Sequence, residues 1–374
     1  ESTVRIYLVG GAVRDRLLGR EIQDNDYVVI GTDREHFLRR FPMACEVGKK
    51  ASVYYVHGDE YTISDAATIE QDLLARDLTI NALAMDADGH IIAHPRAREH
   101  LAGKILYPGS EDAFFDDPAR VFRVARFAAC LPGFSVHPHV ISQMQTVARR
   151  RLTDALSAER VGHELLKSLS CSVPGRFLTV LDQGNCLEPW FGELSHAASI
   201  PAGPLPFHRH SVLEHTCAVM DRLAGSDPLH VWMGFCHDLG KVLTDPGIWP
   251  HHYGHEHRGE MLALQLGARL RLPKKMITAG AVAARWHMTA ARYHALRPGT
   301  RVDFLTRVGS WELLAGICAL VVADGGDEVR LQILHDWEQI QHVHLPEKWQ
   351  GLGARSGEHL RMLRAQALAE SARG

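Results

Sequence analysis

The sequence has no long apolar run and few cysteines, and each absence excludes a class of protein. No apolar stretch approaches the roughly 20 residues of a membrane-spanning helix, so we expect no transmembrane segment. The seven cysteines are scattered without a Cys-x-x-Cys pair, which predicts buried thiols in a reducing compartment and argues against a zinc ribbon or a disulfide framework. The opening ESTVRIYLVGG lacks a basic segment followed by an apolar one, so we expect no signal peptide and a cytoplasmic location.

The chain also has little excess of one sign of charge over the other. The net charge of −3 does not suit a chain that binds polyanions over its whole surface. Locally, Arg120, Arg123 and Arg126 recur every three residues and form a basic stripe of the kind that a nucleic-acid partner needs. The arginine run at 149–151 is interpreted as a solvated helix face. With 46% hydrophobic residues in a chain of 374, we expect packed cores in two to four domains.

Strand patterns are confined to the N-terminal part of the chain, and helical patterns fill the remainder. Residues 4–107 alternate strand-like and helical segments, with hairpin turns at Gly58–Asp59 and Asp88–Gly89. From Pro118 onward, strand signals fade. The sequence therefore predicts an α+β fold, with an N-terminal mixed sheet followed by an all-α remainder. The expected domains are a head (1–112), a helical neck and body (113–200), a third helical domain (201–335) and a helical tail (336–374), with the proline-rich loop 199–210 as the best internal boundary.

Two glycines and two aspartates lie close together in the stretch YLVGGAVRDRLLGREIQDNDYVVIG. Asp24 and Asp26 are spaced i, i+2 in a predicted strand, which directs both carboxylates to one face. Two adjacent carboxylates repel unless a cation lies between them, and hard oxygen ligands suit Mg²⁺ or Mn²⁺. Gly10 and Gly11 end the preceding strand and let backbone N–H groups approach phosphate. The pattern predicts nucleotidyl transfer from a nucleoside triphosphate to a hydroxyl.

Four segments resemble motifs of one enzyme family, the bacterial tRNA nucleotidyltransferases, or CCA-adding enzymes, with their poly(A) polymerase relatives. In chain order they are GGAVRDRLLG…DNDYVV (10–29), ARDLTINALAM (75–85), DDPARVFRVARFAA (116–129) and AERVGHELLKSL (158–169). Their order and spacing fit the family over nearly the whole chain. The resemblance implies a polymerase-β-like nucleotidyltransferase head, CTP and ATP as substrates, and the tRNA acceptor arm as partner.

The resemblance also implies roles for individual residues. Asp24 and Asp26 would be catalytic and bind Mg²⁺. Nucleotide contacts are implied at Gly11, Arg14, Arg76, Asp77, Arg123 and Arg126. Arg123 and Arg126 share a helix side, and their planar guanidinium groups suit a base edge, which is how the family is understood to select C or A without a template. Two alternatives stay open: Asp77 either bonds a ribose hydroxyl or caps the next helix, and Arg120 is either a contact or structural.

Two departures from the family pattern bear on the reaction. Ala75 replaces the first of two arginines that the family usually has before Asp77. The segment DAATIEQDLL (65–74) is shorter than the flexible loop that CCA-adding relatives usually carry there, and CC-only members lack that loop. We therefore favour the hypothesis of C addition over complete CCA addition. The third carboxylate of the site stays open between Glu60 and Asp65.

Metal-ligand residue types recur in the helical remainder, around VWMGFCHDLGK. The candidate ligands are His215, His237, Asp238, His255, His287 and Asp324. Imidazole and carboxylate suit a borderline divalent ion such as Ni²⁺, Co²⁺ or Mn²⁺, which activates bound water for attack on phosphorus. The H…HD…D pattern resembles the HD phosphohydrolases, which implies an HD domain with phosphatase or 2′,3′-cyclic phosphodiesterase activity. Lys241, one turn after His237, is expected to hold a phosphate.

Two other functions stay open on the sequence. One is poly(A) polymerase, which is disfavoured because those relatives usually lack an HD domain and carry a basic C-terminal extension. The other is a phosphohydrolase whose N-terminal half only binds nucleotide or RNA. Intact Asp24 and Asp26 argue against the latter, and Ala75 argues weakly for it. No membrane partner is expected, and the oligomeric state stays open, with a homodimer among the alternatives.

Overall fold

The computed structural model describes residues 4–22, 24–47, 53–205 and 209–371. The chain forms two compact units. The first comprises residues 1–156 and 183–186, and the second comprises residues 157–182 and 187–374. The boundary between the two units follows Leu156, while the division into four domains, with a boundary in the proline-rich loop, stays a prediction.

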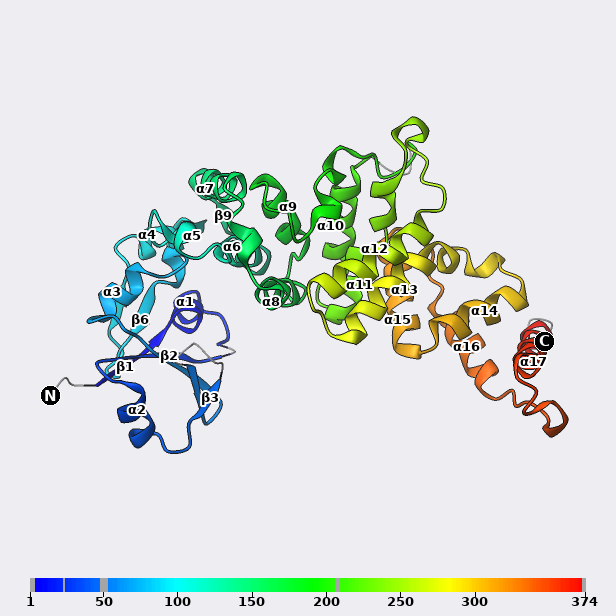
Figure 1. Cartoon of the computed structure of the whole chain (residues 1–374), viewed down its shortest axis with the longest axis horizontal. Coiled ribbons are helices and arrows are strands. Elements are labelled where there is room, and N and C mark those ends of the chain that lie inside the picture. The colour runs from blue at the N-terminus through cyan, green and yellow to red at the C-terminus, as the bar shows by residue number, and fades with distance from the viewer. Residues whose placement is uncertain (1–3, 23, 48–52, 206–208, 372–374) are drawn as a thin grey trace. The chain divides into compact units, whose positions relative to one another are not determined.

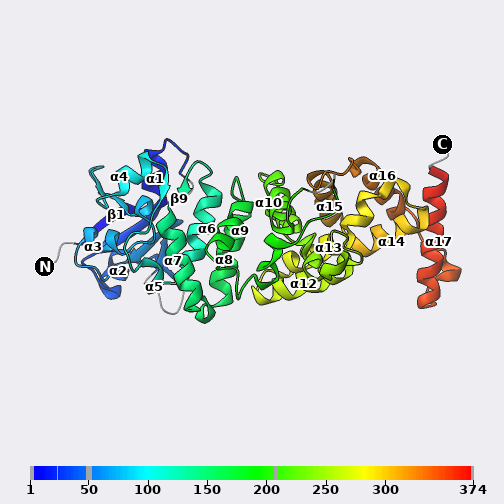
Figure 2. The same ribbon diagram turned by 90° about the horizontal axis from the view of Figure 1, so that it is seen from above.

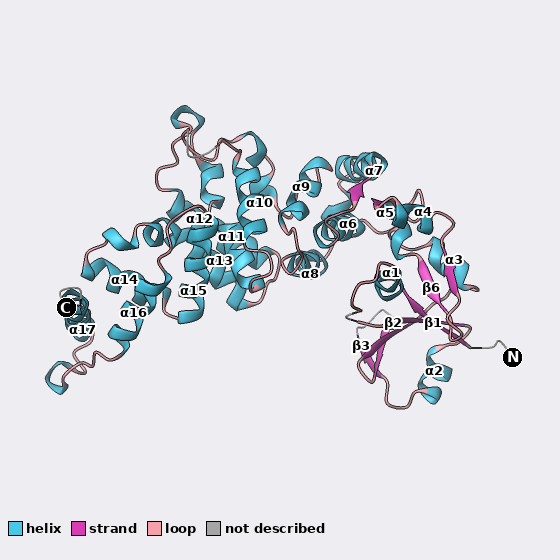
Figure 3. Ribbon diagram, turned by 180° about the vertical axis from the view of Figure 1, so that it is seen from behind, coloured by secondary structure: helices cyan, strands magenta, loops and turns pink. Residues whose placement is uncertain are grey.

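A seven-stranded mixed sheet is the framework of the first unit (Figures 1 and 3). In spatial order its strands are β3 (Cys45–Val47), β4 (Val53–Val56), β5 (Asp59–Ile63), β2 (Asp26–Ile30), β1 (Arg5–Val9), β6 (Leu83–Met85) and β7 (Ile91–Ala93). Both predicted hairpins are confirmed, β4–β5 with Gly58 and β6–β7 with Gly89 in the left-handed turn conformation. β2 and β5 pair in parallel, which sets Asp26, the first residue of β2, beside Glu60, the second residue of β5.

Helices cover both faces of this sheet because apolar side chains project from both. Val28 packs on one face with α3 (Ile69–Leu74). The next residue, Val29, packs on the other face with Phe37 of α2 (Arg34–Arg40). Successive side chains of a strand point to opposite faces of the sheet, so apolar side chains occupy both faces and polar groups are left to the strand ends.

Short elements complete the first unit. They are η1 (Thr79–Asn81), α4 (Ala97–Ala102), α5 (Ala113–Asp116), α6 (Arg120–Cys130), α7 (Pro138–Arg149) and η2 (Leu152–Ala155), with β8 (Ile105–Leu106) paired in parallel to β9 (Ser135–Val136). The apolar positions of α6 are buried, whereas its three arginines are half-buried. The predicted basic stripe therefore lies along one helix.

The named elements of the second unit are all helical in the part of the chain that the structure describes (Figure 3). The long ones are α8 (Ala158–Ser168), α9 (Gly175–Gln183), α10 (Val212–Arg222), α11 (Pro228–Cys236), α12 (His255–Arg269), α13 (Lys274–Ala291), α14 (Pro298–Val308), α15 (Trp311–Ala323), α16 (Arg330–Gln341) and α17 (Ala354–Ser371). The short ones are η3 (Gly192–Leu194), η4 (Ala197–Ser199), η5 (Leu239–Leu243), η6 (Pro246–Ile248), η7 (Tyr293–Ala295) and η8 (Glu347–Trp349). Helices α10, α11 and α13 pack on α15, α12 packs on α13, and α17 packs on α14 and α16 (Figure 2).

The structure bears on two further expectations, that no transmembrane segment is present and that the cysteines are thiols. Among the described residues, no single helix is both long and apolar enough to cross a bilayer, and α14 and α15 reach that length only as a pair bent by 114°. Five cysteines are free thiols, four of them buried. Cys130 and Cys171 are disulfide-bonded, so the expectation of thiols throughout is wrong at these two positions.

Close packing of α8 predicts a stability effect. A Cβ on Gly162 would lie 2.4 Å from the carbonyl oxygen of Leu270, so we expect Gly162→Ala to push α8 away from that segment. Overpacking of this kind costs about 1–3 kcal/mol, measured as a lower midpoint of thermal unfolding. Gly357→Ala in α17 is the control, because its Cβ would meet nothing within 4 Å, and it should not lower the midpoint. An unchanged midpoint for Gly162→Ala would contradict this contact.

Candidate functional sites

The Gly-Gly turn connects β1 to α1 (Gly11–Leu17) through a backbone that favours glycine. Gly10 precedes α1 with a φ of +67°, a conformation that other residues rarely adopt. A Cβ there would lie 3.3 Å from Arg76 Nη1, so this guanidinium approaches the turn closely. Because Val9 pairs with Asp26, the turn begins beside the first residue of β2. The predicted proximity of the glycines and the acid pair is confirmed for Asp26.

The two aspartates occupy different local structures. Asp26 opens β2, whereas Asp24 precedes the strand, so the prediction that both lie in one strand is wrong for Asp24. The reason is that β1 ends opposite Asp26 and the chain then turns into α1, which leaves Asp24 without a ladder partner in β1. Both carboxylates still act on Tyr55. A hydrogen bond to Glu60 raises the pKa of the Tyr55 hydroxyl, and the charges of Asp26 and Asp24 raise it further.

The strand register distinguishes the two candidates for the third carboxylate. Glu60 pairs with Asp26 in the parallel β2–β5 ladder, so the two side chains are neighbours on one face. Tyr55 Oη donates to Glu60 Oε2 at 2.8 Å. Asp65 follows the end of β5, beyond Ile63. The structure therefore brings Glu60, and not Asp65, next to the acid pair.

Asp77 is the centre of a buried polar network. Its Oδ2 accepts from Arg123 Nε at 2.7 Å, and its Oδ1 accepts from Leu78 N and Asn81 Nδ2. Burial raises the pKa of the Asp77 carboxyl, but Arg123 and the other donors outweigh burial and hold the pKa below its usual value. Leu78, not Asp77, is the cap residue of η1, so the capping alternative for Asp77 is wrong.

Arg14 extends this network toward α1. Its side chain is 9% exposed, donates to both carboxylate oxygens of Asp15, and donates through Nη1 to Asn81 Oδ1 at 2.6 Å. The aromatic ring of Phe127 lies beneath three guanidinium groups, with the Cζ atoms of Arg126, Arg14 and Arg123 at 4.2, 5.5 and 5.8 Å from the ring centroid. The shared side predicted for Arg123 and Arg126 is confirmed.

The two remaining arginines differ in role. Arg76 Nη2 lies 3.0 Å from Asp72 Oδ2, and Asp72 also accepts from Ser64 Oγ at 2.8 Å, which ties the end of β5 to α3. Arg120 donates to the carbonyl oxygens of Ala113 and Ala75. These two bonds support the structural role for Arg120, and a nucleotide contact stays a prediction.

All six candidate ligands of the helical remainder converge in the second unit. They are His215 in α10, His237 and Asp238 at the end of α11, His255 at the start of α12, His287 in α13, and Asp324 directly after α15. Asp238 belongs to two trios, one with His215 and His237 and one with His255 and His287. The ligand atoms of each trio lie within 4.8 Å of one another. This histidine centre is the point at which five helices meet.

Each carboxylate oxygen of Asp238 faces a different histidine pair. Oδ2 lies 3.2 Å from His237 Nε2 and 3.5 Å from His215 Nε2. Oδ1 lies 3.4 Å from His255 Nε2 and 3.6 Å from His287 Nε2. One carboxylate that faces two ligand groups is a geometry suited to bridging two cations.

Backbone carbonyls orient three of the four rings. The Nδ1 atoms of His237 and His255 lie 2.7 Å from the carbonyl oxygens of Gly234 and His252. His287 Nδ1 lies 3.1 Å from those of Ala283 and Ala284. We assign the proton to Nδ1 in each ring, so each Nε2 directs a lone pair toward Asp238. Neutral imidazole with a free Nε2 lone pair is the form that binds metal.

The charge environment agrees with this assignment for His287, whereas Asp238 favours a protonated His237. Burial lowers the pKa of His287 to about 4, so this ring is neutral at pH 7. Burial also disfavours charge on His237, but the adjacent Asp238 outweighs burial and raises the pKa of that ring. Lys241 Nζ lies 2.7 Å from Asp238 Oδ2 and donates to the carbonyl oxygen of Ala202 at 2.8 Å. Lys241 is thus the buried counter-charge of Asp238, and its phosphate contact stays a prediction.

Known proteins resemble this chain in sequence. Residues 6–63 match the family model of the poly(A) polymerase head domain. A multifunctional CCA protein of Aromatoleum aromaticum is 38% identical over 327 residues, which cover 81% of this chain and 79% of that protein. A multifunctional CCA protein of Vibrio vulnificus is 34% identical over 370 residues, which cover 91% of this chain and 90% of that protein. The chain belongs to the CCA-adding enzyme family. This confirms the family inferred from the four motifs.

Solved structures of CCA-adding enzymes share the fold. The enzyme of Bacillus stearothermophilus in complex with CTP gives a TM-score of 0.69 at 23% identity, covering 98% of this chain and 89% of that one. The Thermotoga maritima enzyme complexed with tRNA gives 0.64 at 18% identity, covering 98% and 87%. At these identities the likeness concerns the fold, and it confirms the predicted α+β class.

Sequence reasoning missed three residues that shape the first site. Asn81 links Arg14 to Asp77, Asp72 holds Arg76, and Tyr55 binds Glu60. The sequence could have indicated Asn81, since it stands four residues after Asp77 in the second motif. Nothing in the sequence indicates the role of Tyr55, because its contact with Glu60 depends on strand pairing.

The depressed pKa of Asp77 predicts a pH-dependent stability. A carboxyl whose folded pKa lies below its unfolded value near 3.9 contributes stability above that value, which is lost as pH falls through the folded pKa. Asp77→Asn should therefore destabilise the protein by about 1–3 kcal/mol at pH 7, and the difference from the parent should shrink below about pH 4. Thermal unfolding between pH 3 and pH 7 measures this. Asp88→Asn in the exposed turn is the control and should be neutral. A pH-independent difference would contradict the ion pair.

Proposed function

We propose that the first unit transfers nucleotidyl groups from CTP to the 3′ end of tRNA, with Asp24 and Asp26 as the carboxylates that bind Mg²⁺. The observation that carries the proposal is the register Val9↔Asp26 and Asp26↔Glu60, which sets the phosphate-approaching turn and the acids side by side. Bound Mg²⁺ would activate the attacking hydroxyl and neutralise the leaving pyrophosphate. Two carboxylates with the remaining ligands from substrate phosphate and water are typical of Mg²⁺.

The proposed division of labour within this site follows from the contacts. The Gly10 N–H donates to the carbonyl oxygen of Leu83 at 3.0 Å, so we assign the triphosphate to the backbone N–H of Gly11, and Arg76, held by Asp72, lies close enough to add positive charge. Arg123 and Arg126 lie on one side of α6 and present planar donors to a base edge. Arg14 is committed to Asp15 and Asn81, so we propose that it supports α1 and reaches phosphate only if those contacts exchange.

The proposed product is tRNA extended by C. β5 ends at Ile63 and α3 begins at Ile69, so the connection that carries a flexible loop in CCA-adding relatives is only residues 64–68 here. Thr68 caps α3, and Ser64 bonds Asp72, which anchors the connection at both ends. A fixed short connection has no freedom to reshape the base-binding pocket for ATP. Complete CCA addition is the second candidate, and the printed names of the relatives favour it.

Incorporation assays separate the candidates. Three tRNAs that end before C74, after C74 and after C75 would each be given CTP or ATP with Mg²⁺. We expect C addition to the first two and little A addition to the third, while efficient A addition would establish the second candidate. Asp26→Ala should reduce C addition by more than about 100-fold. Asp88→Ala is the control and should retain it, since Asp88 lies in the exposed β6–β7 turn.

We further propose that the histidine centre is a metal-dependent phosphohydrolase site of the HD type. The residues fit divalent cations: the Asp238 carboxylate is buried, and the Nε2 atoms of four histidines lie within 3.2–3.6 Å of its two oxygens. The donor set of imidazole and carboxylate suits Ni²⁺, Co²⁺ or Mn²⁺. The two trios around Asp238 support two ions where the sequence alone suggested one. Bound metal would supply activated water for attack on phosphorus.

Metal loading tests this proposal. His237→Ala removes a fully buried ligand, and we expect it to lose bound Ni²⁺ by equilibrium dialysis and at least about 100-fold in phosphatase activity. His257→Ala is the matched control, because His257 is exposed on α12, and it should keep both. Equal Ni²⁺ binding and activity in the parent and His237→Ala would contradict the proposal.

A further inference from the structure

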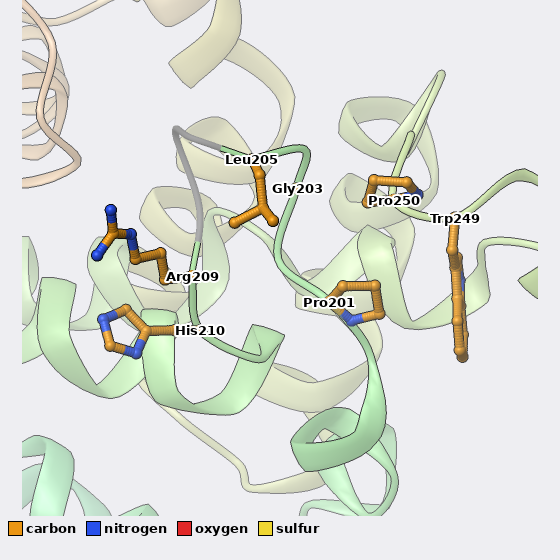
Figure 4. A pocket seen from close by; sticks show the side chains of 7 residues that line it. All are labelled: Pro201, Gly203, Leu205, Arg209, His210, Trp249 and Pro250. Carbon is orange, nitrogen blue, oxygen red and sulfur yellow. The ribbon is translucent and has the colours of Figure 1, made fainter.

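The second unit has a cleft of about 400 Å³, lined by residues that precede α10 and α12 (Figure 4). The carbonyl oxygen of Pro201 on its wall lies 2.7 Å from His252 Nε2, and that of Ala202 accepts from Lys241 Nζ. Main chain therefore separates this cleft from the histidine centre. In the first unit, by contrast, a chain of hydrogen bonds leads directly to the proposed nucleotide contacts.

This chain begins at His94, whose ring is bonded through both nitrogens to main-chain atoms. Nε2 lies 3.0 Å from the carbonyl oxygen of Gly109, and Nδ1 lies 3.1 Å from Arg96 N. His94 directly follows β7, and its own N–H donates to the carbonyl oxygen of Ala82 at 2.8 Å. His94 therefore joins the end of β7 to two stretches of backbone, one at Ala82 and one at Gly109.

The two ring contacts require one protonation state of His94. A backbone N–H only donates, so Nδ1 accepts from Arg96, and the single proton of the ring lies on Nε2, where it donates to Gly109. Burial lowers the pKa of His94 below its usual value of 6.5, and burial together with the Arg96 charge outweighs the Gly109 bond, which raises the pKa. The ring is therefore neutral at pH 7 and makes both bonds at once.

Gly109 connects His94 to the motif ARDLTINALAM. The Gly109 N–H donates to the carbonyl oxygen of Asp77 at 3.0 Å. A Cβ on Gly109 would lie 2.1 Å from the carbonyl oxygen of Arg76, so glycine is required for this close approach of two backbones. One residue, bonded on both sides, thus separates the His94 ring from the main chain of Asp77.

A second histidine supports the same motif two residues later. His100 of α4 is 1% exposed, and its Nδ1 lies 2.7 Å from Thr79 Oγ1. Thr79 N donates to the carbonyl oxygen of Tyr107 at 3.0 Å, and the rings of His100 and Tyr107 lie 4.9 Å apart. The backbone of the motif is therefore bonded at two points, with a histidine at each.

We infer that His94 is a positioning residue for the proposed addition of C: through Gly109 it fixes the main chain of Asp77, and Asp77 in turn fixes the guanidinium of Arg123. The 2.7 Å bond between Asp77 Oδ2 and Arg123 Nε is the last step of this chain. The inference rests on the proposed nucleotidyl transfer. It adds a residue that acts only through its neighbours and determines how firmly Arg123 is held.

Two substitutions of His94 test the inference in the full chain with Mg²⁺. His94→Leu removes both ring bonds and should raise the KM for CTP by about 5- to 10-fold, the equivalent of one lost hydrogen bond. The KM for tRNA and kcat should stay unchanged. His94→Gln offers one donor and one acceptor in a similar arrangement and should restore the parent KM. His90→Leu is the control and should keep the parent values, because His90 lies in the exposed β6–β7 turn.

A different kinetic pattern would contradict the inference. A general folding defect lowers the active fraction, so a reduced kcat with both KM values unchanged in His94→Leu would overturn the positioning role. An unchanged KM for CTP with an unchanged kcat would overturn it as well. Failure of His94→Gln to restore the KM would show that the two bonds are not what His94 contributes.

Hydrogen exchange measures the same link without turnover. The N–H groups of Thr79 and Gly109 should exchange faster in His94→Leu than in the parent, and at the parent rate in His94→Gln. If the parent adds no nucleotide, the nucleotidyl-transfer proposal fails, and faster exchange in His94→Leu would still support His94 as the residue that fixes this segment. Equal exchange in all three proteins would overturn it.

Discussion

The buried carboxylate of Asp238 is the constraint on which the second unit depends. It is 2% exposed, and a buried charge costs several kcal/mol unless cations or donors face it. The chain supplies Lys241 on one oxygen and directs four imidazoles from four segments toward the two oxygens together. The packing of α10 to α13 is therefore an electrostatic arrangement as much as an apolar one.

In the first unit, the guanidinium group of Arg123 stabilises the buried carboxylate of Asp77. Arg123 binds Asp77 through Nε, which fixes the plane of the guanidinium relative to η1, and Phe127 supports the neighbouring arginines from below. A donor whose direction is fixed before substrate arrives loses little entropy on binding. The base selection proposed for Arg123 would require this rigidity, and the Asp77–Arg123 pair would supply it.

The sequence allowed the family, the α+β class and the convergence of six second-site residues to be predicted, because each residue stands in a motif whose neighbours fix its helix position. One error and one undecided alternative share a physical cause. Asp24 lies outside β2, and Asp77 binds Arg123 instead of capping η1, because these outcomes depend on pairing between distant segments. The choice of Glu60 over Asp65 likewise follows from strand register, which local pattern does not contain.

The proton positions in the histidine centre are determined by main-chain atoms. His237, His255 and His287 each direct Nδ1 to a carbonyl three or four residues earlier in the chain. A carbonyl cannot be exchanged by substitution of its residue, so mutation of the surrounding side chains leaves the tautomer intact. The orientation of these three rings is therefore insensitive to substitution of the residues that supply the carbonyls, and a change would require bending of the helices.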